Sequence, residues 1–119
     1  MAERRSNRIR WRDYRTRSGR SPVGEFLLDL PITDSLCVRE AMREVATLGM
    51  TYVRHLSDEL WEVRADGDRA SYRVIFAREG SRNQVLLALV AFRKTTMKTP
   101  RKPLQLAAAR LADWRARGS

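Results

Sequence analysis

The chain has 119 residues, with 24 lysines and arginines against 14 aspartates and glutamates, so its formal net charge is +10. This length suits one domain whose core is large enough to need no disulfide or metal. A single cysteine, Cys37, excludes an internal disulfide and a cysteine-cluster zinc site. No apolar run approaches the length of a membrane span. We therefore expect a soluble, cytoplasmic protein with no signal peptide and no cofactor.

The positive charge is concentrated at the two ends of the chain. Residues 1–20 carry eight basic and two acidic residues, a net charge of +6, and residues 93–119 carry eight basic residues and one acid, a net charge of +7. Residues 21–92 carry a net charge of −3. Basic surfaces favour phosphate-rich partners because binding releases counterions, although an acidic protein would also suit them. We treat residues 1–119 as one domain and leave open whether residues 1–7 form a flexible basic arm.

The first predicted element is a strand. Residues 8–12 alternate basic and apolar side chains, which predicts a strand with Ile9 and Trp11 facing inward. A short helix should follow, because Ser21 can cap its start and Pro22 suits its first position.

A second helix is predicted after Pro31, which ends the first. Thr33 or Asp34 can cap its start, apolar residues then recur at helical spacing, and Gly49 is placed to end it. These two helices predict a helical hairpin.

Three strands should come next. Residues 60–65 and 71–77 flank the sequence Asp-Gly-Asp at 66–68, which is a strong hairpin signal. Residues 84–92 form the third strand, and because every position from Val85 onward is apolar, both of its faces should be covered.

A final helix is predicted beyond Pro100 and Pro103, and Pro103 is expected to remove one early helical hydrogen bond. One stripe of this helix carries its apolar residues, which are Leu104, Ala107, Ala108, Leu111 and Trp114. The order β-α-α-β-β-β-α predicts an α+β fold in which the helices cover one face of a small, mostly antiparallel sheet.

The hairpin separates two kinds of residue. Placing its turn at Gly67-Asp68 pairs Glu62 with Arg73, and strand alternation then defines two faces. The predicted core face carries Trp61, Val63, Tyr72, Val74 and Phe76. The other face carries Glu62, Arg64 and Arg73, and Lys94 could reach it if the sheet curves. This face is a plausible phosphate cradle, but an Arg73–Glu62 ion pair, a solvated Arg64 and a solvated turn over 93–102 are the structural alternatives.

The single histidine and the single cysteine are not expected to take part in catalysis. His55 is the only histidine, which excludes a ribonuclease that uses two histidines as acid and base, and we expect it to make a surface polar contact. Cys37 lies within a predicted amphipathic helix and is expected to be buried rather than reactive.

Four segments resemble, in order, motifs of the RelE/ParE toxin superfamily and specifically its phage-derived HigB-like branch. They are residues 60–64 (LWEVR), 72–76 (YRVIF), 92–100 (FRKTTMKTP) and 108–114. The resemblance implies a RelE-like fold and a type II toxin, a ribosome-dependent mRNA endoribonuclease. It also implies a helix-turn-helix (HigA-like) antitoxin encoded nearby. The alternative is a non-catalytic basic protein of the same fold that binds nucleic acid or ribosomes.

The resemblance also implies site residues. It assigns RNA-phosphate and catalytic roles to Arg64, Arg73, Lys94 and Lys98, and leaves open which lysine holds the central role. RNA is cleaved without a metal when its 2′-hydroxyl attacks the adjacent phosphate, so the protein must orient the strand and stabilise charge. Glu62 is ranked as an orienting residue for this reaction. Further RNA contacts are expected from the basic, hydroxyl-rich segment after the third strand: Arg93, Thr95, Thr99, Arg101 and Lys102.

Overall fold

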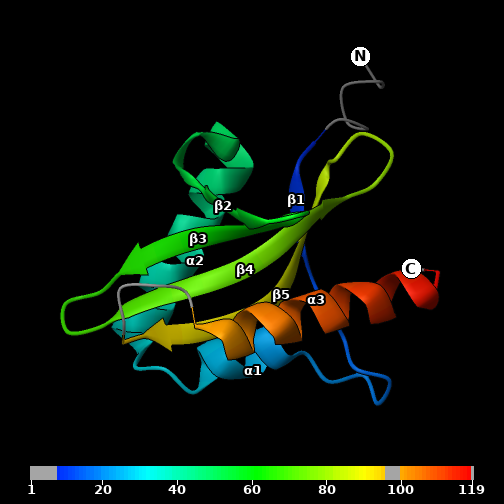
Figure 1. The fold of residues 1–119 in the computed structure, drawn as a ribbon. Helices are drawn as coiled ribbons and strands as arrows, with labels where there is room; N and C mark the ends of the chain where they lie inside the picture. Colours follow the sequence, from blue (N-terminus) through cyan, green and yellow to red (C-terminus); the bar gives the residue numbers. More distant parts are fainter. Residues whose placement is uncertain (1–7, 96–99, 119) are drawn as a thin grey trace.

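The computed structural model describes residues 8–95 and 100–118, and it contains one five-stranded sheet and three α-helices (Figure 1). In chain order the elements are β1 (Arg10–Asp13), α1 (Pro22–Leu28), α2 (Ile32–Leu48), the 3₁₀ helix η2 (Met50–Tyr52), β2 (Arg54–Ser57), β3 (Leu60–Asp66), β4 (Ser71–Glu79), β5 (Val85–Lys94) and α3 (Arg101–Ala116). The predicted α+β class is confirmed.

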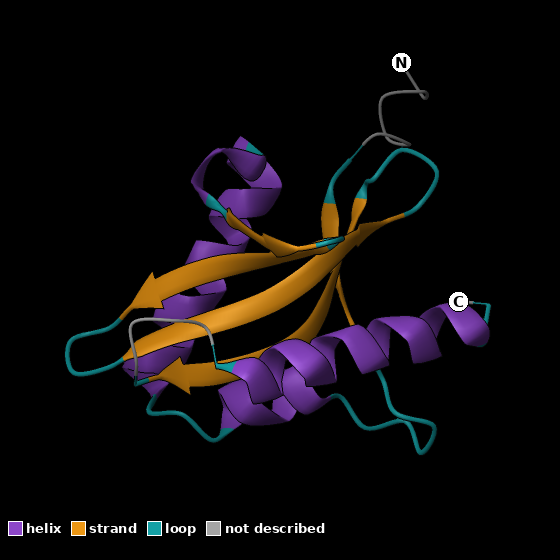
Figure 2. Ribbon diagram, in the orientation of Figure 1, coloured by secondary structure: helices purple, strands orange, loops and turns teal. Residues whose placement is uncertain are grey.

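The sheet is mixed, with the strand order β1-β5-β4-β3-β2. The pairs β5–β4, β4–β3 and β3–β2 are antiparallel, whereas β1 runs parallel to β5. Figure 2 shows how the three long strands β3, β4 and β5 cross the molecule as one twisted layer. The prediction of a mostly antiparallel sheet is therefore correct for all pairs except the one that β1 makes.

The sequence prediction missed β2. This strand is short and its first two residues are exposed, so it has no apolar alternation to reveal it. It lies at the edge of the sheet, and its register against β3 shifts between His55 and Ser57.

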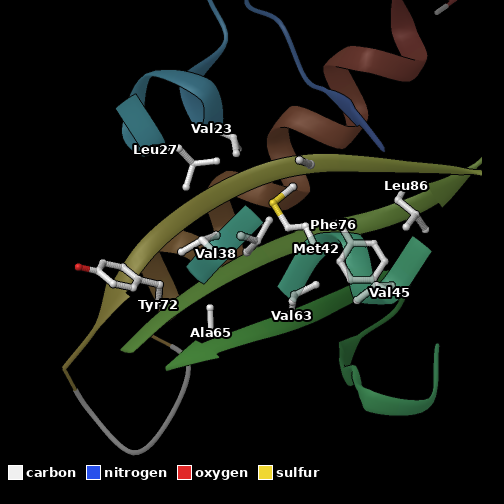
Figure 3. Close-up of a cluster of buried hydrophobic side chains, with 12 residues drawn as sticks. Val23, Leu27, Val38, Met42, Val45, Val63, Ala65, Tyr72, Phe76 and Leu86 are labelled. Carbon is white, nitrogen blue, oxygen red and sulfur yellow. The ribbon is translucent and has the colours of Figure 1, made fainter. Parts of the chain in front are cut away.

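Helices cover both faces of the sheet, so the prediction of helices on a single face was wrong. On one face, α1 and α2 pack on a core that contains Val38, Met42, Val63 and Phe76 (Figure 3). On the other face, α3 packs over β4 and β5 on a second core. The cause is β5, whose side chains are buried on both faces from Val85 to Val90 and therefore need a covering layer on each.

The register of the β3–β4 hairpin differs from the prediction by two residues. Trp61 lies opposite Phe76, and Arg73 lies opposite Arg64 rather than Glu62. The turn is longer than predicted, since the Gly67 amide donates a hydrogen bond to the Ala70 carbonyl. Because side chains alternate with a period of two, this shift moves no residue to the other face. The predicted core face is accordingly confirmed.

Of the N-terminal caps predicted for α1 and α2, one is present and the other is not. As predicted, the Ser21 hydroxyl caps α1 by accepting a hydrogen bond from the Gly24 amide at 3.2 Å. The cap predicted for α2 was wrong, because that helix begins at Ile32 and neither Thr33 nor Asp34 caps it. The Tyr72 hydroxyl donates to Asp34 at 2.6 Å instead, which links β4 to α2. That hydrogen bond, together with burial, raises the pKa of Tyr72.

The last helix follows the predicted stripe, with one exception. Ala107, Leu111 and Trp114 are buried, whereas Ala108 is exposed. Pro103 removes no helical hydrogen bond, contrary to the prediction, because it is the third residue of α3. The first amide that reaches back along the helix is that of Leu104, which donates to Pro100.

The Tyr72–Asp34 hydrogen bond gives a stability prediction. Tyr72→Phe leaves a carboxylate without its donor, so the free energy of unfolding should fall by about 1–2 kcal/mol. Tyr52→Phe is the matched control, because Tyr52 is 75% exposed. Urea unfolding at neutral pH measures both variants. Equal stability of the two would show that this hydrogen bond contributes nothing to the fold.

Candidate functional site

The three basic residues that the sequence analysis grouped lie on one face of the sheet. Arg64 is directly opposite Arg73 across β3 and β4, and Lys94 is directly opposite Ser71 across β4 and β5. Directly opposed residues share a face, and Ser71 and Arg73 share theirs by alternation. No curvature of the sheet is needed, as the prediction for Lys94 had required, because Lys94 is itself part of β5.

Three polar residues of this face were missed by the sequence analysis. Asp66 and Ser71 close the hairpin, and Arg54 on β2 lies opposite Glu62. Asp66 and Ser71 could have been found from the alternation that placed Arg64 and Arg73, whereas Arg54 depends on a strand without an apolar pattern. We call the whole group the strand-end cluster: Arg54, Glu62, Arg64, Asp66, Ser71, Arg73 and Lys94.

Arg73 is the buried centre of the cluster. Its side chain is 7% exposed and that of Glu62 is 4% exposed, with 3.6 Å between the Arg73 Nε and the Glu62 Oε1. The Arg73 Nη1 donates a hydrogen bond to the backbone carbonyl of Tyr72 at 2.9 Å. It also lies 3.9 Å from the Asp66 Oδ1. Fixed acceptors within the fold therefore surround this guanidinium, and little of it faces solvent. The ion pair with Glu62 that was the structural alternative is present.

Arg64 and Asp66 form the exposed part of the cluster. The Arg64 Nε lies 3.1 Å from the Asp66 Oδ2, with the two side chains 68% and 54% exposed. The Ser71 hydroxyl donates to the Asp66 Oδ1 at 2.7 Å. This hydrogen bond, aided by the positive charges of Arg64 and Arg73, lowers the pKa of Asp66. Asp66 is therefore ionised at neutral pH and is a weak base.

Lys94 is one cation of the cluster that is free to contact a ligand. It is half-buried, and its ammonium makes no hydrogen bond or ion pair with the residues that the structure describes. Four cations (Arg54, Arg64, Arg73, Lys94) face two acids in the cluster, so it keeps a net charge of +2. An anion is the ligand that this surplus favours.

The remaining predicted RNA contacts are distributed around the cluster. Arg101 and Lys102 are exposed in the first turn of α3, which contains no acidic residue, so the positive end of the helix dipole adds to their charge. Thr95 is exposed just beyond β5. Arg93 pairs with Tyr72 and so points to the opposite face, away from the cluster. Lys98 and Thr99 lie outside the described residues.

The two residues set aside in the sequence analysis lie on the other side of the sheet from the cluster, His55 opposite Trp61 and Cys37 on α2. His55 is exposed, its Nε2 is 2.7 Å from the Asp58 carbonyl oxygen, and its ring packs on Trp61. This is the surface polar contact that was predicted. Cys37 is partly buried, its thiol donates to the Asp66 carbonyl at 3.4 Å, and burial raises the pKa of the thiol. A raised pKa makes this cysteine unreactive at neutral pH.

Two further properties bear on the class of protein. Within residues 8–95 and 100–118, no three His, Cys, Asp or Glu side chains are grouped so that they could hold a metal ion. No helix in that part of the chain is long and apolar enough to cross a membrane.

The family of the chain follows from a comparison with family models. Residues 25–112, which are most of the chain and include the whole strand-end cluster, match the family described as "Phage derived protein Gp49-like (DUF891)". The chain therefore belongs to the Gp49-like family of phage-derived proteins. No curated protein matches it.

The buried centre of the cluster gives a second stability prediction. Arg73→Met removes one partner of a buried ion pair, and the free energy of unfolding should fall by about 3–5 kcal/mol. Adding Glu62→Gln should recover part of the loss, since no charged carboxylate then stays buried. Arg64→Met is the matched control, and because Arg64 is exposed its cost should stay within about 0.5 kcal/mol. Denaturant unfolding that finds the two arginine variants equally stable would contradict this account of the cluster.

Proposed function

We propose that the chain is the toxin of a type II toxin–antitoxin system and that it cleaves mRNA on the ribosome without a metal ion. The observation that carries the proposal is the grouping of Arg64, Arg73 and Lys94 on one face of the sheet. The same residues belong to the segments that resemble the HigB-like branch of the RelE/ParE superfamily. Membership of the Gp49-like phage-derived family supports a toxin-like protein.

The cluster suits the chemistry of RNA cleavage by its own 2′-hydroxyl. In this reaction the 2′-oxygen loses its proton and bonds to phosphorus, and the bond from phosphorus to the 5′-oxygen breaks. The products are a 2′,3′-cyclic phosphate and a 5′-hydroxyl that has gained a proton. Negative charge grows on the phosphate oxygens in the transition state, so cations held in place there lower the barrier.

In this proposal the three cations have different roles. Lys94 and Arg64 are the groups that reach the phosphate, because one is unpaired among the described residues and the other is 68% exposed. Arg73 is a positioning residue, because its buried guanidinium forms ion pairs with Glu62 and Asp66. Asp66 orients Arg64 through their 3.1 Å contact.

The partners of this function are also part of the proposal. The substrate is mRNA in the ribosome, and a helix-turn-helix antitoxin of the HigA-like kind neutralises the toxin. The exposed basic residues at the start of α3, Arg101 and Lys102, would then contact RNA outside the cleavage site.

A non-catalytic protein of the same fold is the second candidate, and one observation favours it. The two acids of the cluster are poorly suited to act as the base, since the Glu62 side chain is only 4% exposed and the pKa of Asp66 is lowered. If neither accepts a proton from the 2′-hydroxyl, the cluster binds phosphate and does not cleave it. Such a protein would inhibit translation by occupying the ribosome.

Cleavage in the presence of translating ribosomes separates these candidates. Lys94→Ala should reduce the cleavage rate by about 10²–10³-fold, the scale for losing one preorganised donor to the transition state. Primer extension on mRNA from a translation reaction measures the rate.

The matched control is Arg43→Ala, which removes an exposed cation from α2 on the opposite face of the sheet. It should cleave like the native protein. Translation arrest by the native protein without any new mRNA end would favour the non-catalytic candidate. Full cleavage by a folded Lys94→Ala variant would remove Lys94 from the mechanism.

A further inference from the structure

A basic cavity lies at the other end of α3 from the strand-end cluster. It has a volume of about 440 Å³ and is lined by Arg12, Asp13, Arg15, Trp114 and Arg117. These residues come from the end of β1, the segment just after it, and the end of α3. Three of the five lining side chains are arginines, and we call this site the arginine cavity.

Arg12 is held in place with its hydrogen-bond donors unused. Its guanidinium carbon lies 5.1 Å from the centre of the Trp114 ring, and Trp114 is itself 6% exposed. Within the described part of the chain, this guanidinium makes no hydrogen bond or ion pair. A guanidinium over an aromatic ring keeps its in-plane N–H groups available, and these match a phosphate in a two-pronged contact.

In each of the other two arginines of the cavity, part of the guanidinium contacts other groups of the protein. The Arg117 Nη2 bonds the Arg15 carbonyl and lies 2.8 Å from Asp113, whereas its Nε is buried and has no hydrogen-bond partner in the described residues. The Arg15 Nη1 donates to the Gly19 carbonyl at 3.0 Å, which leaves its other donors for a ligand.

Acidic neighbours do not neutralise the cavity. The Asp13 carboxylate accepts a hydrogen bond from the Ser21 hydroxyl at 2.9 Å. Asp113 is shared between Arg117 and Arg17, which lies 3.5 Å away. The four arginines Arg12, Arg15, Arg17 and Arg117 against these two aspartates leave a net charge of +2.

The arginine cavity lies outside the segment that matches the family model. All of its lining residues lie outside residues 25–112. It also gives a structural use to part of the basic N-terminal region, since Arg12 and Arg15 belong to it. Arg8 and Arg10 are exposed and extend the row of positive charge along β1.

We propose that the arginine cavity is a second RNA subsite, which holds a backbone phosphate of the single strand whose cleavage site lies at the strand-end cluster. This inference rests on the proposed function. The two sites lie at opposite ends of α3, so a rise of 1.5 Å per residue separates them by about 22 Å between Lys102 and Arg117. A polyanion with regularly repeated charges spans such a distance, and a base can stack on a guanidinium plane such as that of Arg12.

The test compares four proteins for binding to a labelled single-stranded RNA of about 12 nucleotides, within the range of site sizes that such proteins cover. They are the native protein, the cavity variant Arg12→Gln/Arg15→Gln, the cluster variant Arg64→Gln/Lys94→Gln, and the control Arg39→Gln/Arg43→Gln on α2. All three variants lose two positive charges, so a loss that is specific to position can be separated from the loss of net charge. Fluorescence anisotropy over a series of salt concentrations gives both affinity and salt dependence, and thermal melts check the fold. Arg15→Gln alone replaces the double variant if that variant melts early.

The cavity variant should bind RNA about tenfold more weakly, and the slope of log affinity against log salt should fall by about 0.7, the value for one lost phosphate contact. The control should bind like the native protein. A cavity variant that matches the control overturns the subsite and leaves the proposed function standing. A cluster variant that matches the control, beside a weakened cavity variant, removes the cluster from RNA binding and keeps the subsite.

Two further outcomes would overturn the inference. Native protein that binds no RNA removes the subsite, whereas the proposed function is judged by cleavage in the translation reaction. An oligoglutamate peptide is the probe for an acidic protein partner. If it displaces RNA from the native protein at an equal charge concentration and has no effect on the cavity variant, the arginine cavity is a peptide site instead.

Discussion

The arrangement of the whole chain depends on the burial of β5 on both faces. Its side chains are buried without interruption from Val85 to Val90, so each face of this strand must be covered. β1 and β4 complete its backbone hydrogen bonds from the two sides, α1 and α2 cover one face, and α3 covers the other. The polar end of the same strand, at Lys94, then emerges beside the hairpin that carries Arg64 and Arg73. The same strand therefore contributes buried side chains to the core and Lys94 to the strand-end cluster.

The position of α3 connects the two basic sites. Polar contacts fix this helix at several points: Arg110 donates to the Leu89 carbonyl at 2.7 Å, Tyr14 donates to Asp113 at 2.6 Å, and Arg115 bonds both Glu59 and Glu79. Leu89 is the residue of β5 that has no partner in the β4 register, so Arg110 supplies a donor where the ladder is interrupted. With the helix fixed in this way, the strand-end cluster stays at its start and the arginine cavity at its end. The spacing between the two sites is therefore set by the length and position of α3.

Local patterns predicted the elements well and the long-range arrangement less well. The alternation around Trp61 and Tyr72 predicted the correct core face, because a register error of two residues leaves every side chain on its own side. The parallel pairing of β1 with β5 could not be read locally, since it joins segments far apart in the chain. The same limit hid the arginine cavity, which brings Arg12 next to Trp114. In the strand-end cluster, sequence reasoning found the three central cations but not the burial of Arg73, because burial depends on packing between segments far apart in the chain.

The most direct test of this account is where RNA touches the protein. Single-stranded RNA that contains a photoreactive uridine analogue can be crosslinked to the native protein, and mass spectrometry then identifies the attached peptides. The account predicts crosslinks in peptides from β3 to β5 around the strand-end cluster, and in peptides from β1 and the end of α3 around the arginine cavity. Crosslinks confined to α1 and α2, on the opposite face of the sheet, would contradict it.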